Sequence, residues 1–397
     1  MKALLFDVNI PKFLMLQALS PLSSKLFYSG PLKTIQLVNI AEPELPSPEW
    51  VKIKTRLCGF CGSDINLILL KDSPTASPFT SFPCVPGHEI FGEIVEIGSD
   101  VKAFHMGDRV TLAPMLNCTV RGIKPECRSC REGRPGNCEN FAEGAFSPGM
   151  FTGICRDING GFAEYVVGHQ SQLYRVPENI SPESAVLTEP LAVAVQAVLD
   201  SKPDKHEKVL LIGGGVIGSL LIKAIRALDI GCDITVAEPS PFQAEHAMES
   251  GADRIVSEKT IDTAAGITGG RAYKPMLGQN ILMGGFDKVY DTVGHAPTLN
   301  KALRVTNTGG TISVIGIGKD VKLDLTPLWL KLQTVKGCYS GTRQAFQTAL
   351  QMMEEGGIRL EDMVTHKFPL EEYSKMIEAN INKTAAQAIK TVFSFEK

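Results

Sequence analysis

The feature that most constrains the fold is an alternation of strand and helix patterns in the second half of the chain. Continuous apolar runs such as KVLLIG (208–213) and DITVAE (233–238) alternate with helical segments such as SLLIKAIRALDIG (219–231). Such apolar runs are typical of strands covered on both faces, and strands that alternate with helices form parallel sheets. The sequence therefore predicts an α/β fold with a doubly wound parallel sheet over residues 192–336.

A glycine-rich turn, GGGVIG, follows the first strand of this series and opens a helix. It fits the G-x-G-x-x-G pattern, whose glycines allow a tight turn, close approach of a pyrophosphate and close helix packing. The alternative is a glycine-rich turn without a ligand. We expect the following residues of the turn to bind a dinucleotide: Gly213, Gly215, Val216, Ile217 and Gly218.

Glu238 ends the second strand of the series, twenty positions after Gly218. A carboxylate at this place accepts hydrogen bonds from the adenosine ribose hydroxyls, and a 2′-phosphate would meet an anion. The sequence therefore predicts a preference for NAD over NADP.

The first half of the chain has a different residue pattern. Short alternating runs such as WVKIKTRL and EIFGEIVEIG are separated by glycine and proline, which is typical of an antiparallel β-domain. Asp7, Asn9 and Pro11 interrupt the apolar N-terminus, so we interpret it as a strand and a loop. Towards the C-terminus we expect helices around 343–356 and 370–380, followed by the strand AIKTVFSF.

Composition limits the classes of function. The chain has 397 residues and a net charge of −3, which provides no electrostatic footprint for nucleic acid or an anionic membrane. We therefore expect neither as a partner. We see no transmembrane span and no secretory signal, so we expect a cytoplasmic protein whose ten cysteines are mostly reduced.

Four cysteines gather in one loop-rich segment, and we call Cys118, Cys127, Cys130 and Cys138 the cysteine cluster. Four thiolates can enclose one tetrahedral Zn²⁺ without an open position, which is typical of a structural site. A loop that is empty or disulfide-bonded remains the alternative. Basic side chains nearby would offset the charge of such a site: Arg121, Lys124, Arg128, Arg131 and Arg134.

A second candidate set is mixed in chemistry. GFCGSD contains Cys61, PGHEIFGE contains His88 and Glu89, and TEPLA contains Glu189. One thiolate, one imidazole and one or two carboxylates are the ligands of a catalytic zinc, which keeps a position open for substrate or water. The spacing alone also fits a buried core histidine at His88.

Taken together, these motifs make the chain similar to the zinc-containing medium-chain dehydrogenases, the group with alcohol, sorbitol and threonine dehydrogenases. GFCGSD, VPGHEIFGEIVEIG, GDRV, GGFAEYVV, EPLAVAVQAV, GGGVIG and GGTISVIG occur in family order from about Glu42 onwards. The resemblance implies a homodimer or homotetramer and a GroES-like domain split by a Rossmann domain. It implies these divisions: a GroES-like catalytic domain at 1–191 with a structural zinc lobe at about 114–142, a Rossmann NAD-binding domain at 192–336, and a return to the catalytic domain at 337–397.

The resemblance also implies residue roles. It places Cys61, His88 and Glu189 near the catalytic zinc, with Glu89 as a direct or exchanging ligand. Ser63 falls where the family has a hydroxyl that relays the proton, and Asp64 matches an acid that supports the site.

Two positions depart from the family pattern. Asn66 replaces a histidine that in many members passes the proton to solvent, and an amide cannot titrate. Eight residues separate Cys118 from Cys127, where the family usually has two, so Cys118 must reach the cluster through a longer loop.

The resulting hypothesis is a zinc-dependent alcohol or polyol dehydrogenase that transfers a hydride between a secondary or primary alcohol and NAD, with two Zn²⁺ per chain. The zinc would act as a Lewis acid that lowers the pKa of the alcohol, and Ser63 would take the proton. One alternative is an NADPH-linked aldehyde or ketone reductase of the same fold. A zinc-ribbon module that binds nucleic acid is a non-enzyme alternative, which the near-neutral charge opposes.

Overall fold

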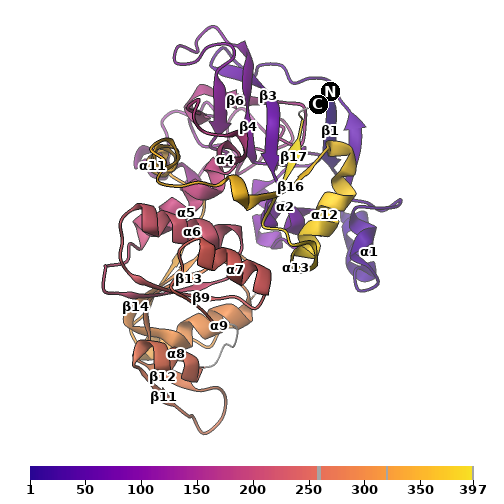
Figure 1. Cartoon of the computed structure of the whole chain (residues 1–397). Helices are drawn as coiled ribbons and strands as arrows, with labels where there is room; N and C mark the ends of the chain where they lie inside the picture. Colours follow the sequence, from indigo (N-terminus) through magenta and orange to yellow (C-terminus); the bar gives the residue numbers. More distant parts are fainter. Residues whose placement is uncertain (257–260, 319–320, 396–397) are drawn as a thin grey trace. The chain divides into compact units, whose positions relative to one another are not determined.

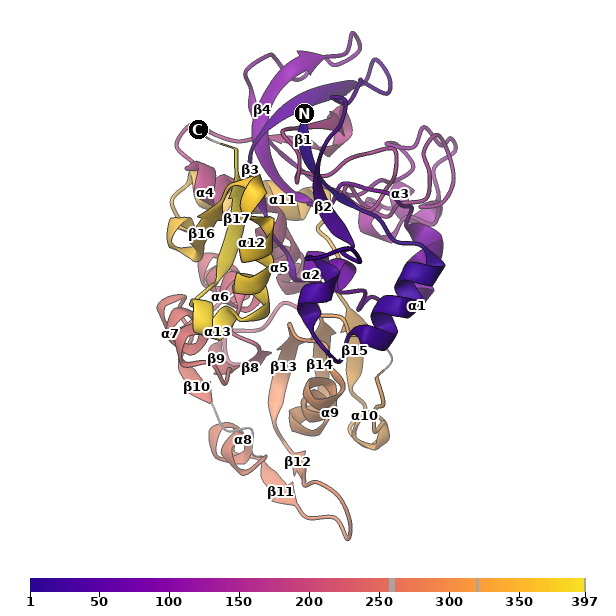
Figure 2. The same ribbon diagram turned by 90° about the vertical axis from the view of Figure 1, so that its right-hand side faces the viewer.

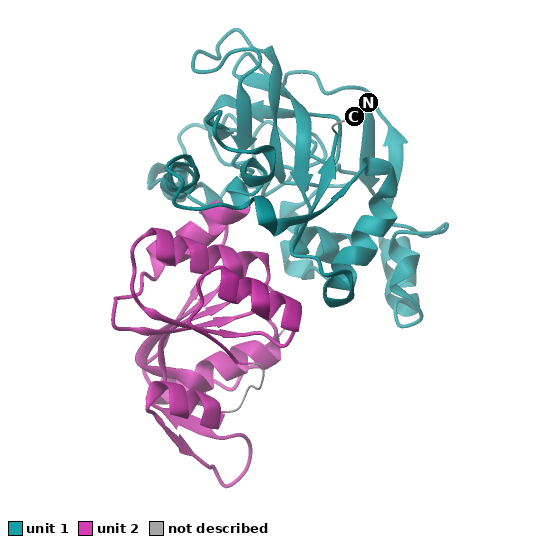
Figure 3. Cartoon of the chain, in the orientation of Figure 1, with its two compact units in different colours: residues 1–189, 341–397 teal, residues 190–340 magenta. Residues whose placement is uncertain are grey.

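The computed structural model describes residues 1–256, 261–318 and 321–395. The chain folds as two units (Figure 3). Unit 1 contains residues 1–189 and 341–397, and unit 2 is the continuous segment 190–340. The sequence placed the corresponding boundaries after residues 191 and 336.

Unit 2 is built on a six-stranded parallel sheet. Its strands are β8 (Lys208–Ile212), β9 (Asp233–Ala237), β10 (Arg254–Val256), β13 (Phe286–Asp291), β14 (Thr306–Val314) and β15 (Thr334–Gly337). The separate hairpin consists of β11 (Arg271–Tyr273) and β12 (Ile281–Met283). The helices are α5 (Thr188–Asp200), α6 (Val216–Ala227), α7 (Pro241–Glu249), α8 (Ile261–Thr268), α9 (Ala296–Val305) and α10 (Thr326–Leu330).

The strand order confirms the doubly wound sheet. The sheet runs β10-β9-β8-β13-β14-β15, so the chain winds outwards from β8 and then returns to the other side of it (Figure 2). Helices α6 and α7 lie on one face and α9 on the other (Figure 1). Strand residues Leu210, Val289 and Ile312 are buried against Ala302 and Leu303 of α9. The direction of winding reverses between β8 and β13, and ligands of such sheets bind at the carboxyl ends of strands at this point.

Unit 1 contains a mixed, mainly antiparallel sheet in the order β16-β17-β3-β4-β5-β7, with β6 paired to β3. The strands of this sheet are β3 (Trp50–Gly59), β4 (Glu89–Ile97), β5 (Arg109–Leu112), β6 (Tyr165–His169), β7 (Leu173–Arg175), β16 (Val364–Phe368) and β17 (Lys390–Ser394). A separate two-stranded antiparallel sheet contains β1 (Lys2–Phe6) and β2 (Ile35–Asn39). The α-helices of unit 1 are α1 (Ile10–Leu19), α2 (Gly62–Ile68), α3 (Arg128–Arg131), α4 (Pro182–Ala185), α11 (Arg343–Glu354), α12 (Tyr373–Ile381) and α13 (Lys383–Ala386), and the first two residues of α5 also belong to this unit. Short 3-10 helices are η1 (Ser24–Phe27), η2 (Pro74–Phe79), η3 (Pro135–Asn137), η4 (Gln170–Gln172), η5 (Glu361–Met363) and η6 (Leu370–Glu372).

Aromatic packing ties the C-terminal strand into the core of unit 1. β17 pairs with β3 and places Phe393 opposite Cys58. Phe60 stacks on Phe162 with ring centroids 5.5 Å apart, and Phe393 meets Phe162 edge-on at 4.9 Å. These three buried rings fix the chain immediately before Cys61, because Phe60 is its direct neighbour.

The N-terminal expectation was wrong in part. The strand β1 is present, but the loop expected after it contains the helix α1. Asn9 caps this helix by accepting a hydrogen bond from the backbone N–H of Lys12, and Pro11 stands in its first turn. Asn9 and Pro11, which we interpreted as interruptions, are therefore helix-start residues. Within the described ranges, no helix is both long and apolar enough to cross a membrane.

Candidate functional site

The mixed set of candidate ligands comes together at the carboxyl end of β3. Cys61 follows this strand and precedes α2, while His88 and Glu89 stand at the start of the neighbouring strand β4. One ligand atom from each of Cys61, His88 and Glu89 lies within 4.8 Å of the other two. Antiparallel pairing of β3 with β4, with Gly59 opposite Glu89, produces this meeting of distant residues.

Asp64 supports two members of this group from the third position of α2. Its Oδ2 accepts a hydrogen bond of 2.8 Å from the backbone N–H of Cys61. Its Oδ1 lies 3.8 Å from Nδ1 of His88. Burial raises the pKa of Asp64 to about 6, although His88 and the Cys61 amide oppose this shift.

Lys390 is a member of the site that the sequence analysis missed. Its Nζ donates to both carboxylate oxygens of Glu89, at 2.7 and 2.5 Å, and lies 3.4 Å from the carbonyl oxygen of Phe60. Lys390 and Glu89 are both almost completely buried, so each charge needs the other. The available signal was a lysine inside the apolar strand AIKTVFSF.

Glu189 and Ser63 lie outside the group formed by Cys61, His88 and Glu89. Glu189 is buried in the first turn of α5, outside the group of three but close enough to interact electrostatically with His88, Glu89 and Lys390. Burial raises the pKa of Glu189 to about 7. Ser63 is exposed on α2, two residues after Cys61.

The donor set suits a dication. Cys61, Glu89 and Glu189 all interact electrostatically with the buried Lys390. Lys383 is a second cation that interacts with Cys61 and Glu89. Burial acts to lower the pKa of His88, but Asp64 and then Cys61 raise it well above the usual value. No described residue lies within hydrogen-bond distance of the buried Nδ1 of His88. An excess of negative groups around an imidazole, with a thiol beside it, is the environment in which zinc binds.

The cysteine cluster also forms a compact group, with all four sulfur atoms within 4.8 Å of one another. All four cysteines are free, which excludes a disulfide in this structure. Backbone N–H groups of Cys127 and Glu139 donate to sulfur atoms at 3.4 Å, and the amide of Asn140 donates to Cys118 at 3.3 Å. Burial acts to raise the pKa of Cys127, but hydrogen bonds from Glu139 and Cys130 lower it to about 7, which favours a thiolate ligand.

The longer loop between Cys118 and Cys127 has an internal support. Arg121 is buried, and its guanidinium donates to five backbone carbonyls, those of Leu116, Glu143, Phe146, Ser147 and Gly149. We expected Arg121 to help offset thiolate charge, and it interacts electrostatically with Cys138 and Cys118 of the cluster. It also joins the beginning of the lobe to residues 143–149, which supports the longer loop between Cys118 and Cys127.

The glycine turn of unit 2 has the shape that a pyrophosphate requires. Gly213 has a φ of +99°, and a Cβ at Gly218 would lie 2.1 Å from the carbonyl oxygen of Gly213. A Cβ at Gly215 would meet no atom within 4 Å, so this side of the turn is open. Gly215 precedes α6 without a side-chain cap, which leaves the N-terminal amides for an anion.

Glu238 follows β9 and is held by the same turn. Its Oε2 accepts from the backbone N–H of Gly214 at 2.8 Å, and its Oε1 accepts from that of Ser240 at 2.7 Å. A carboxylate has about four acceptor positions, so each oxygen can accept one more hydrogen bond from a ribose hydroxyl. The two amides fix the direction in which those positions point.

Family models match both parts of the chain. Residues 47–178 match the alcohol dehydrogenase GroES-like domain, and residues 216–355 match the zinc-binding dehydrogenase domain. The fold of unit 2 and the thiol-containing cluster of unit 1 thus define the class: an oxidoreductase that uses zinc and a nicotinamide dinucleotide.

Individual relatives narrow this class. (R,R)-butanediol dehydrogenase of Bacillus subtilis (strain 168) is 31% identical over 350 residues, which cover 86% of this chain and 91% of the relative. Sorbitol dehydrogenase of Arabidopsis thaliana is 30% identical, with 88% and 90% covered. The X-ray structure of 2R,3R-butanediol dehydrogenase from Bacillus subtilis matches with a TM-score of 0.72 and 29% identity, over 91% of this chain and 96% of that one. The chain belongs to the zinc-containing medium-chain dehydrogenases.

Proposed function

We propose that this chain oxidises a secondary or primary alcohol, or a polyol, with NAD as the hydride acceptor. The observation that carries the proposal is the meeting of Cys61, His88 and Glu89 within 4.8 Å, beside the buried Glu189. When bound there, Zn²⁺ supplies Lewis-acid polarisation of a substrate oxygen. The relatives named for butanediol and sorbitol support a small hydroxylated substrate.

The proton of the substrate hydroxyl leaves through residues of α2. Ser63 offers an exposed hydroxyl two residues after Cys61, so it can accept that proton and pass it to water. Asn66 lies three residues further along the same helix and cannot hold a proton as a histidine would. We therefore assign the transfer to Ser63 and solvent, without a titrating relay at Asn66.

The remaining groups position the reacting ones. Asp64 orients the loop of Cys61 through its hydrogen bond to the backbone N–H. Lys390 donates hydrogen bonds to both carboxylate oxygens of Glu89. Glu89 therefore binds the metal only when it exchanges with another ligand, and not permanently. We assign the metal-ligand roles to Cys61, His88 and Glu189, with Glu89 exchanging in.

The test is a screen of alcohols, polyols and amino alcohols with NAD, followed by NADH absorbance. Cys61→Ala should abolish turnover and leave NAD binding intact, because the dinucleotide site belongs to unit 2. Cys232→Ala is the matched control, since Cys232 is a buried cysteine outside both clusters. Turnover only of aldehydes or ketones with NADPH, or full activity in Cys61→Ala, would contradict the proposal.

We further propose a homodimer that associates through β15. This strand ends the sheet of unit 2, and all four of its residues are exposed. Trp329 and Leu332, just before it, are 76% and 77% exposed. An open strand edge beside apolar side chains favours pairing with a second copy. Size-exclusion chromatography with light scattering should give a dimer, and Val335→Pro should give a monomer.

A cytoplasmic location is part of the same proposal. All ten cysteines are free in the structure, which suits a reducing compartment. Fractionation of cells that produce the full chain would test it.

A further inference from the structure

A hollow in unit 2 lies at the amino ends of the sheet strands. It has a volume of about 470 Å³. Lys208 begins β8, Asp287 stands at the start of β13, and Asn307 stands at the start of β14; all three line it. In a parallel sheet the amino ends lie opposite the carboxyl ends, so this hollow is separate from the glycine turn that follows β8.

The lining is strongly polar and mostly basic. His206, Lys208 and Arg271 contribute three side chains with nitrogen donors, two of them cationic, and Asp287 contributes the one carboxylate of the lining. Four glycines and a threonine supply much of the remaining wall: Gly269, Gly270, Gly284, Gly285 and Thr268. Such a surface does not suit an apolar ligand, because its polar groups would lose their water without new partners.

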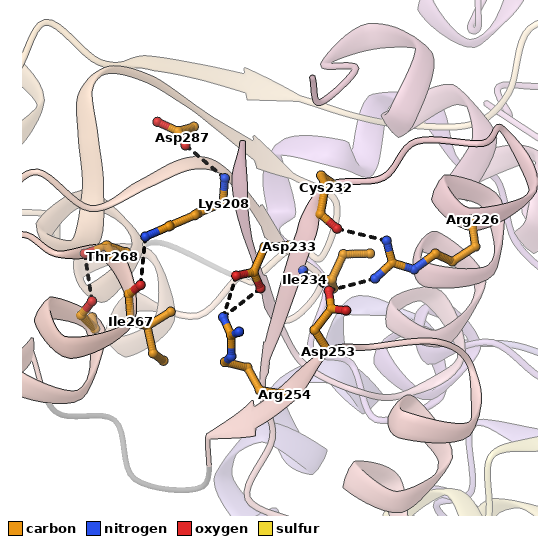
Figure 4. A network of polar contacts seen from close by, with 11 residues as sticks. Lys208, Arg226, Cys232, Asp233, Ile234, Asp253, Arg254, Ile267, Thr268 and Asp287 are labelled. Atoms are coloured by element: carbon orange, nitrogen blue, oxygen red, sulfur yellow. Dashed lines mark hydrogen bonds and ion pairs between the residues drawn. The ribbon is translucent and has the colours of Figure 1, made fainter. Parts of the chain in front are cut away.

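The carboxylate is already engaged by the protein. Oδ2 of Asp287 accepts from the backbone N–H of Lys208 at 2.9 Å, and its Oδ1 accepts from Nδ2 of Asn307 at 2.9 Å. The Nζ of Lys208 points the other way and donates to the carbonyl oxygen of Ile267 at 2.9 Å (Figure 4). This hydrogen bond uses one ammonium proton and holds the charge in place, which leaves two protons for a ligand.

Arg271 differs from two other arginines of unit 2. Arg226 pairs with Asp253 at 2.7 Å and Arg254 with Asp233 at 2.6 Å, as Figure 4 shows. Arg271 is exposed at the start of β11, and no described residue forms a hydrogen bond or ion pair with it. Its five N–H donors are therefore free to bind an anion through the planar fork of the guanidinium.

We propose that this hollow binds a small anion that carries a phosphate group. The guanidinium of Arg271 and the ammonium of Lys208 contact the phosphate oxygens, and His206 adds a third donor. The neutral amide donors on Asp287 offset part of its negative charge, and the cations Arg271 and Lys208 outweigh the remainder. The site adds a second phosphate-binding place to unit 2 and does not depend on the alcohol substrate proposed above.

The experiment is a calorimetric titration of the holoenzyme with inorganic phosphate at low salt, in the presence of saturating NAD. NAD fills the glycine turn, so phosphate that binds at that turn is excluded. We expect saturable binding of one phosphate per chain. Arg271→Gln and Lys208→Gln should each weaken it at least tenfold, while Lys322→Gln, an exposed lysine of unit 2 outside the hollow, should not change it.

A second arm repeats the titration with glycerol phosphate. Tighter binding than that of inorganic phosphate assigns the site to phosphate esters, and equal binding assigns it to the free ion. The proposal is overturned if phosphate does not bind in the presence of NAD. It is equally overturned if Arg271→Gln binds like the wild type, or if Lys322→Gln weakens binding as much. Arg271 is exposed, so its variant tests binding without a loss of packing; a thermal melt of each variant verifies that it is folded.

Discussion

Two buried charged residues hold the candidate metal site of unit 1 in place. Glu89 and Lys390 are 1% and 2% exposed, and the ammonium lies against both carboxylate oxygens. A buried ion pair contributes little net stability, but removal of one partner leaves a charge without water or a counter-ion. The pair therefore specifies the arrangement of the site more than it stabilises the fold.

This pair yields the first prediction. Lys390→Met should lower the free energy of unfolding by about 3–5 kcal/mol, because Glu89 stays buried and unpaired. The double variant Lys390→Met with Glu89→Gln should recover most of this loss. Lys367→Met is the control, since its pair with Glu183 is partly exposed and should contribute about 0–1 kcal/mol. Urea denaturation measures all three, and equal effects of the two single variants would refute the prediction.

Glu238 sets the second prediction, which concerns the cofactor. A 2′-phosphate would lose the ribose hydrogen bonds and face a carboxylate that Gly214 and Ser240 hold in place. We expect kcat/KM to favour NAD over NADP by about a hundredfold, and Glu238→Ala to reduce this ratio towards one. Glu245→Ala, an exposed glutamate on α7, should keep the wild-type ratio. A wild-type ratio near one would count against the assignment.

At the scale of elements, a lysine joins the end of α9 to its neighbours. The Nζ of Lys331 donates to carbonyl oxygens of Arg304 and Thr306, at the end of this helix, and of Leu282 in β12. The side chain is completely buried, and burial lowers the pKa of Lys331 from 10.5 to about 8. A cation at the C-terminus of a helix is favourable. For Lys331, however, burial removes water from the ammonium group and so disfavours its charged form.

This shift predicts a dependence of stability on pH. Between pH 8 and 10.5 the unfolded chain holds a proton on Lys331 that the folded chain has released, so the contribution of this residue to stability rises with pH. The full rise is about 3 kcal/mol. Thermal melts of wild type and Lys331→Met across this range measure it as a difference. The curves of the two proteins should converge in shape below pH 8; parallel curves over the whole range would disprove the effect.

The sequence predicts elements well where one pattern controls them. The parallel sheet follows from the alternation of strand and helix patterns. The tight turn at 213–218 follows from the spacing of its glycines. Helix α1 was missed because Asn9 and Pro11 are equally common in turns and at helix starts. The contact between Cys61 and His88 depends on the pairing of β3 with β4, which no local pattern encodes. Lys390 was missed because its partner is 301 positions away.

At the scale of the whole molecule, the two ligand clusters lie in the same unit and have different surroundings. The cysteine cluster offers four thiols in a loop-rich lobe, and the mixed cluster offers one thiol with nitrogen and oxygen ligands. Closed thiolate sites stabilise a fold, whereas mixed sites leave a position for chemistry. The two should therefore respond differently to loss of a ligand.

We predict about two zinc ions per chain in protein purified without chelator. Cys130→Ser should remove one ion and lower the melting temperature, because structural zinc contributes to folding. Cys61→Ala should remove the other and abolish turnover with a smaller effect on melting. Cys338→Ser, outside both clusters, serves as the control. A content near one in the wild type that Cys130→Ser does not change would eliminate the structural site.

The pairing of Glu89 with Lys390 also determines when the site can form during synthesis of the chain. The ribosome adds roughly 5–20 residues per second, so the 301 positions between these partners correspond to a wait of roughly 15–60 s. Unit 2 is continuous and can fold while it emerges, but unit 1 receives β17 only near the end of translation. A nascent chain thus carries its cofactor-binding unit before its catalytic centre is complete, and a polypeptide released early retains Glu89 without a counter-ion.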